Sequence, residues 1–160
     1  MNWRKIGEVV IYILLYIWQL PQNILALAFI LLSRGERVIL KQKYTRFYIA
    51  PSMNGGTSLG NYIFLSKKSG LREPSYDHEF GHCIQSRILG PLYLPTVGIC
   101  SGIHAWLYNG EGNYYDFWTE RWANKLGGIP GYKGENHFHK EGVIHTVYKE
   151  LLNKYKKFKF

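Results

Sequence analysis

The sequence predicts an α+β fold, because strand-like runs in its first half are followed by helices with defined ends. Three runs between residues 37 and 66 are rich in β-branched and aromatic residues, as strands are. The later segments 75–89 and 113–127 carry the starting and stopping residues of helices. A hydrophobic segment at 9–32 precedes them. With 160 residues, 46% of them hydrophobic, the chain is long enough to bury a core.

The charge balance predicts an anionic partner. Twenty Lys and Arg residues against eleven Asp and Glu give a net charge of +9, which suits a membrane surface, a nucleic acid or an acidic substrate. Nucleic acid fits worst, because the basic residues are spread along the chain and no nucleic-acid-binding motif occurs. Two cysteines, Cys83 and Cys100, exclude a disulfide framework.

The N-terminal hydrophobic segment allows three interpretations. No charge falls between Glu8 and Arg34, so the run is long enough for a kinked transmembrane or re-entrant helix. Two short helices, buried or lying in a membrane interface, also fit. So does a cleaved signal peptide, since basic residues precede the apolar run. Polar and helix-breaking residues divide the run at Gln19, Pro21, Gln22 and Asn23.

These features predict a division of the chain at residue 33. Residues 1–33 would form the hydrophobic helical segment, either a membrane anchor or a buried helical pair, and 34–160 a single domain. If the segment spans a bilayer, the basic residues after it outnumber Arg4 and Lys5. The positive-inside rule then places the domain on the cytoplasmic side.

The strand-like runs predict a small antiparallel sheet. They are RVILKQ (37–42), TRFYIA (45–50) and NYIFLS (61–66), and the short interval at 43–44 allows a hairpin between the first two. The intervening PSMNGGTSLG (51–60) is rich in Gly, Pro and Ser and is interpreted as a break in regular structure.

The helix predicted at 75–89 carries HEFGH, residues 78–82. Ser75 favours its start, and Gly90-Pro91 its end. His78 and His82, four residues apart, lie on one helix face and can point at one ion, and neutral imidazole suits zinc. Glu79 can take a proton from a zinc-activated water. The same pattern also arises by chance in a helix with two histidines, so a third ligand is needed.

The segment YYDFWTERWANKLGG (114–128) offers that ligand on a second helix. Its core face is a stripe of Trp118, Trp122 and Leu126. Glu120 and Asn124, four residues apart, share a different side of the helix. A carboxylate from Glu120 would complete a His₂Glu set, which binds zinc in thermolysin-like sites.

The pairing of HEFGH with ERWAN resembles the gluzincin clan of zinc metalloproteases. More narrowly, it resembles minigluzincins and the membrane-embedded proteases related to CAAX prenyl proteases, which combine HExxH with an ExxA[DN]-type helix. The resemblance covers residues 37–128 and rests on those two motifs and on the order of the elements. It implies a zincin-like fold and zinc-dependent peptide hydrolysis, with Glu79 as general base and His78, His82 and Glu120 as zinc ligands.

The resemblance also implies roles around the metal. Such families often place an acidic residue where Asn124 stands, to hold a ligand imidazole; the neutral amide makes that ligand less basic. This substitution favours the alternative of an inactive, membrane-associated binding or scaffold protein. Extended peptide is expected to bind beside the strand at Gly60, Asn61 and Tyr62. For the transition-state oxyanion the chain offers Tyr114, Tyr115, His104, His137 and His139, without a choice among them.

The C-terminal segment predicts an amphipathic helix with a basic, aromatic end. Residues 142–160 place apolar side chains on one face, from Val143 to Tyr155. This helix either docks on the core or lies on an anionic lipid surface. The expected partners of the chain are therefore a peptide or protein substrate and membrane lipid, and not nucleic acid.

Overall fold

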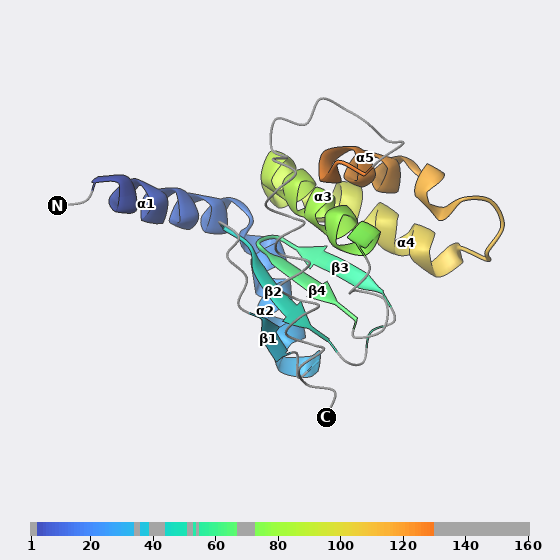
Figure 1. Cartoon of the computed structure of the whole chain (residues 1–160), viewed down its shortest axis with the longest axis horizontal. Coiled ribbons are helices and arrows are strands. Elements are labelled where there is room, and N and C mark those ends of the chain that lie inside the picture. Colours follow the sequence, from blue (N-terminus) through green and yellow to red (C-terminus); the bar gives the residue numbers. More distant parts are fainter. Residues whose placement is uncertain are drawn as a thin grey trace.

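The computed structural model describes residues 3–33, 36–38, 44–50, 53, 55–66 and 73–129. Its fold is α+β, as predicted (Figure 1). The helix predicted at 142–160 lies outside the described residues, as do His137 and His139. In chain order the elements are α1 (Trp3–Trp18), α2 (Leu20–Ser33), β1 (Glu36–Val38), β2 (Arg46–Ile49), β3 (Gly56–Leu59), β4 (Tyr62–Leu65), α3 (Glu73–Leu89), α4 (Ile99–Leu107) and α5 (Trp118–Gly127).

The sheet is mixed, so the predicted antiparallel sheet is wrong in part. Its order is β1-β2-β4-β3. β1 pairs antiparallel with β2, but β2 runs parallel to β4. The reason is β3, which lies in the segment interpreted as a break and forms a hairpin with β4. Gly60 opens the two-residue turn of this hairpin with a positive φ of 61°, a conformation that suits glycine.

Helices cover both faces of the sheet. On one face, Ala26 of α2 packs against Tyr62 and Phe64 (Figure 1). On the other face, α3 contributes Tyr76, Phe80, Cys83 and Ile84 to a cluster with residues of β2 and β4. All four residues of β4 are buried, because a strand covered on both faces has no solvent side.

The polar residues that interrupt the hydrophobic segment fix a sharp bend. The axes of α1 and α2 differ by 87°. At the bend, Gln19 Nε2 donates to Asn61 Oδ1 over 3.1 Å, and Asn23 Oδ1 accepts from the Asn61 amide over 3.0 Å. Gln22 donates to the carbonyl of Gly90. The bend is thereby attached to the β3–β4 turn and to the end of α3.

No helix in the described part of the chain is by itself long and apolar enough to cross a bilayer. Two bent pairs reach the required length and composition only when their members are taken together, Trp3–Trp18 with Leu20–Ser33 and Tyr76–Leu92 with Leu94–Leu107.

Close packing of α3 on α5 brings the two halves of the site together. A Cβ atom on Gly81 would overlap the carbonyl group of Ala123, and one on Gly127 would overlap that of Asp77. Glycine at these positions therefore lets the two backbones touch. The helix predicted from Asn113 begins only at Trp118 and follows a 3₁₀ turn, Tyr114–Asp116, whose Tyr115 amide donates to Asn113 Oδ1. The core stripe expected on this helix is wrong: Trp118 is exposed, and the buried residues are Thr119, Glu120, Ala123, Asn124 and Gly127.

Candidate metal centre

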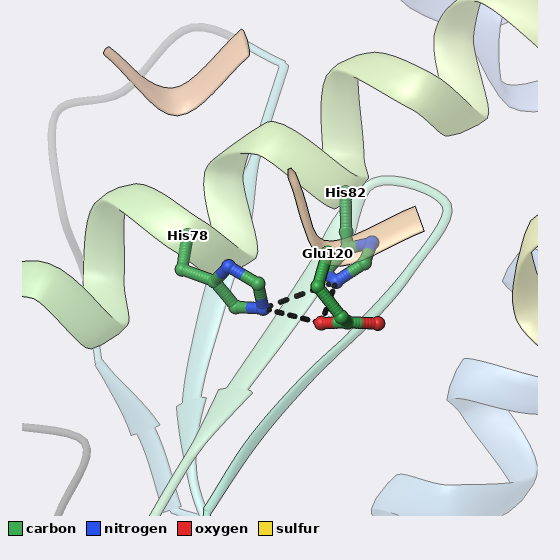
Figure 2. Close-up of side chains that lie close together, drawn as sticks. All are labelled: His78, His82 and Glu120. Carbon is green, nitrogen blue, oxygen red and sulfur yellow. Dashed lines mark hydrogen bonds and ion pairs between the residues drawn. The ribbon is translucent and has the colours of Figure 1, made fainter. Parts of the chain in front are cut away.

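Three buried side chains from two helices converge on one point. His78 and His82 lie on successive turns of α3, and Glu120 lies in the first turn of α5 (Figure 2). Glu120 Oε2 is 3.0 Å from His78 Nε2 and 3.3 Å from His82 Nε2. The two Nε2 atoms are 3.2 Å apart. All three residues are buried, so little water reaches these atoms.

Two amide side chains fix the orientation of both imidazoles. His78 Nδ1 is 2.7 Å from Asn124 Oδ1, and His82 Nδ1 is 2.7 Å from Gln85 Oε1. An amide oxygen only accepts hydrogen bonds, so each Nδ1 carries the proton. The neutral rings then direct their Nε2 lone pairs towards Glu120. Gln85 is itself held by the carbonyl of Thr119, to which its Nε2 donates over 2.9 Å.

With neutral rings, the three side chains present three electron-pair donors to one point. In a tetrahedral site with ligand distances of about 2.0–2.2 Å, ligand atoms stand roughly 3.3–3.6 Å apart. The observed separations of 3.0, 3.2 and 3.3 Å are close to those values. The donor set therefore fits a metal ion, and His78, His82 and Glu120 could bind one.

Hydroxyl groups settle which oxygen of Glu120 faces the histidines. Its Oε1 accepts from Ser101 Oγ and, over 3.0 Å, from Thr119 Oγ1, which leaves Oε2 for the ligand position. Burial raises the pKa of Glu120, but the hydrogen bonds that His78 and His82 donate when their rings are protonated outweigh burial and hold the pKa well below the usual range. The carboxylate is therefore ionised, as a metal ligand must be.

Glu79 stands beside the centre without belonging to it. Its Oε2 is buried and has no hydrogen-bond partner among the described residues. Burial raises the pKa of this carboxyl group, although the neighbouring histidines oppose the shift. A Cβ atom on Gly56 of β3 would lie 2.5 Å from Glu79 Oε1, so only glycine leaves room for this carboxylate.

A pocket of about 350 Å³ opens onto the two histidines and both glutamates. Its walls are β3, α3, the inner side of α4 and Tyr114. The expected peptide-binding residues Gly60, Asn61 and Tyr62 do not line it. Of these residues, Tyr62 belongs to β4, which lies inside the sheet between β2 and β3, whereas β3 occupies the edge beside the pocket.

The edge strand β3 turns the backbone groups of alternate residues away from β4. The Ser66 amide donates to the Gly55 carbonyl over 2.9 Å, which marks that pair as hydrogen-bonded. Alternation in an antiparallel ladder then directs the N–H and C=O groups of Thr57 and Leu59 towards β4. Those of Gly56 and Ser58 point the opposite way, and both residues line the pocket.

The candidates for an oxyanion donor differ in their position relative to the pocket. Tyr114 lines the pocket, whereas the ring of Tyr115 meets that of His78 edge-on at 5.2 Å. His104 does not line the pocket, since its Nε2 bonds the Tyr114 carbonyl over 3.0 Å and its ring stacks on Phe117.

Sequence reasoning missed two residues of this region. The first, Tyr93, is a buried residue of the pocket wall in an apolar run that carried no functional signal. The second is Gln85, which a search for hydrogen-bonding residues three positions after a ligand histidine would have found.

Comparisons of the chain with protein-family models, with curated proteins and with solved structures each returned no match. The described residues by themselves present a buried His–His–Glu donor set that could bind a metal ion. Beside it lie a buried carboxylate oxygen without a partner and a pocket along a strand edge.

Proposed function

We propose that this protein is a zinc-dependent metallopeptidase of gluzincin type. The observation that carries the proposal is the donor triangle. Two Nε2 lone pairs and one carboxylate oxygen converge at 3.0–3.3 Å, with both Nδ1 protons held by amide oxygens. Glu79 lies in the same pocket.

The donor types favour zinc over other common ions. Imidazole nitrogen suits zinc, whereas calcium and magnesium prefer sites built from oxygen alone. Three protein ligands also leave a fourth position open, which distinguishes catalytic from structural zinc sites. When bound, the ion supplies Lewis acidity, which polarises a carbonyl group and makes water easier to deprotonate.

Glu79 is the proton carrier of the proposed reaction. Its unpartnered Oε2 takes a proton from a water molecule while the water oxygen attacks the carbonyl carbon of the substrate. The same carboxyl group then gives the proton to the amide nitrogen as the C–N bond breaks. A carboxyl group whose pKa is raised by burial is suited to both transfers.

The free edge of β3 is the proposed substrate-binding element. An extended peptide that pairs with the backbone groups of Gly56 and Ser58 adds a strand to the sheet. Its backbone then passes beside Glu79, because Gly56 lies against that side chain. Pairing of this kind holds any sequence, so side-chain preference comes from the rest of the pocket.

A second candidate function is a metal-binding scaffold without catalysis. It is favoured by the neutral partners of both histidines, Asn124 and Gln85, because an uncharged acceptor leaves the ligand imidazole less basic than a carboxylate does. This version predicts bound zinc and no peptide cleavage.

Two variants separate these functions. Elemental analysis of the purified chain is expected to give about one zinc ion per chain, and the Glu120→Ala variant, which lacks one ligand, much less. Glu79→Gln should keep its zinc and lose hydrolysis of a quenched peptide library. Zinc without hydrolysis in the unchanged protein would favour the scaffold, and no zinc after loading at neutral pH would refute both.

A further inference from the structure

Helix α4 has two different faces, and only one of them is explained by the pocket. Small residues on its inner side, Ser101, Gly102 and Ala105, line the pocket. The outer side carries Ile103, Trp106 and Leu107, and all three are exposed. Trp106 is 83% exposed, and no residue of α4 is buried. A helix of this composition normally buries its apolar face against another surface.

The amino-acid composition around α4 favours lipid as the partner of its outer apolar face. No Asp, Glu, Lys or Arg lies between Arg87 and Glu111, so the surface that this stretch of the chain contributes carries no acidic or basic side chain of these types. Trp106 and Tyr108 stand at the end of the helix, and such aromatic residues are enriched where protein meets the membrane–water boundary. The net charge of +9 complements an anionic lipid surface.

The apolar surface of α4 continues towards α1. Trp18, at the end of α1, donates its indole N–H to the Arg87 carbonyl over 3.0 Å, and its ring packs where a Cβ atom of Gly90 would lie. Leu92, between this junction and α4, is 61% exposed. Exposed apolar residues thus occur on α1, at the junction and on α4.

The shape of the α1 surface also argues for a bilayer rather than a second copy of the chain. Helix α1 has no buried residue. At 100° per residue, its exposed Val9, Val10, Ile11, Ile13 and Leu14 cover about 200° around the axis. A single protein patch covers one side of a helix, whereas lipid can surround it.

We propose that the outer face of α4 lies in the interface of an anionic bilayer, as a second lipid-contacting surface beside the N-terminal helices. In this arrangement α4 separates the pocket from the lipid, with its small residues on one side and Ile103 and Trp106 on the other. The pocket then opens next to the membrane surface. The proposal does not depend on bound metal or on hydrolysis.

The test is the depth of a spin label placed on the outer face. Ile103→Cys in a Cys100→Ser background accepts a nitroxide label, while the buried Cys83 does not react. Lys125→Cys on α5, exposed and away from α4, is the matched control. Vesicles of phosphatidylcholine, with and without phosphatidylglycerol, are added to the full-length chain. Collisions with oxygen and with an aqueous nickel chelate are then measured.

With phosphatidylglycerol present, the label at 103 should gain oxygen contact and lose nickel contact, and the label at 125 should stay aqueous. If the chain sediments with the vesicles while the label at 103 remains as open to nickel as the control, α4 does not touch lipid. Immobilisation of that label without vesicles, together with a dimer in solution, would instead assign the face to a second copy and overturn the proposal.

A binding measurement gives an independent check. The double variant Ile103→Ser/Trp106→Ser should lower the partition coefficient into anionic vesicles by about tenfold or more, because two large apolar side chains no longer leave water. Trp118→Ser, an exposed tryptophan on α5, should leave it within about twofold. Equal losses in both variants would contradict a specific role of α4.

Discussion

At the scale of single residues, the metal centre depends on partners that are not ligands. Ser101 and Thr119 occupy one oxygen of Glu120, so that the other oxygen alone faces the histidines. Asn124 and Gln85 fix the tautomers of the two rings. Such outer partners commonly contribute about 10- to 100-fold to metal affinity.

Replacing Ser101 with alanine should therefore weaken zinc binding by about tenfold, since Glu120 then loses one of the two donors that orient it. Competition with a chromogenic chelator measures the change. Thr96→Ala is the control, because it removes a hydroxyl group that bonds the Leu92 carbonyl and does not line the pocket. Equal affinities in both variants would show that Ser101 has no orienting role.

Asn124 offers a test in both directions. Asn124→Ala should lower zinc affinity by about tenfold, because His78 loses the acceptor that fixes its tautomer. Asn124→Asp should raise zinc affinity, since a carboxylate makes the ligand imidazole more basic. It should also lower the melting temperature of the metal-free protein, because the new charge is buried. A fall in affinity in both variants would mean that the amide N–H₂ group is the part that matters.

At the scale of secondary-structure elements, glycines set how closely the parts of the site approach. Gly81 lies inside HEFGH and faces the backbone of Ala123, so it brings α5 and Glu120 to the histidines. Gly56 likewise allows the Glu79 side chain to lie against β3. Substitution of Gly81 should therefore affect metal binding, whereas substitution of Gly56 should affect hydrolysis alone.

Gly81→Ala should separate α3 from α5 and lower the free energy of unfolding by about 1–3 kcal/mol, since the added methyl group meets backbone atoms that cannot turn aside. Zinc affinity should fall with it. Chemical denaturation and chelator competition measure the two effects, and unchanged zinc affinity in a destabilised variant would contradict the link.

Gly56→Ala should displace only Glu79, whose side chain can move away from the new methyl group. The expected result is unchanged zinc content with hydrolysis lowered by about 100-fold, the usual order of loss when a catalytic group is misplaced by about an ångström. A peptide-cleavage assay beside elemental analysis measures it. Loss of zinc in this variant would mean that β3 also supports the ligands.

At the scale of the whole molecule, the metal should stabilise the fold. Its ligands come from two helices that are neighbours only in the folded chain, so the unfolded chain binds zinc poorly. Free zinc at about 1,000 times its dissociation constant should add roughly 4 kcal/mol to the free energy of unfolding. Removing zinc with a chelator should lower the melting temperature, and that of Glu120→Ala should respond little to either treatment.

Features encoded within a few residues were predictable from the sequence. The α+β class and the positions of β2 and β4 follow from local propensity. The two histidines share a helix face because four residues make about one turn. The chain offered no similar signal for β3, since GTSL contains a single β-branched residue, begins with a glycine and follows an asparagine and another glycine.

Tertiary structure alone decided the sheet topology, the bend between α1 and α2 and the assembly of the donor set. These features depend on contacts between distant parts of the chain. Pairing of β3 with β4 made the sheet mixed and placed β3, rather than the strand at 61–66, beside the pocket. Gln19, Gln22 and Asn23 interrupt the hydrophobic segment in the sequence, and in the fold they hold its bend against Asn61 and Gly90. The sequence by itself determined which side chains could serve a metal. Packing of α5 on α3 decided that they meet, since only there are the three electron-pair donors brought within 3.3 Å of one another.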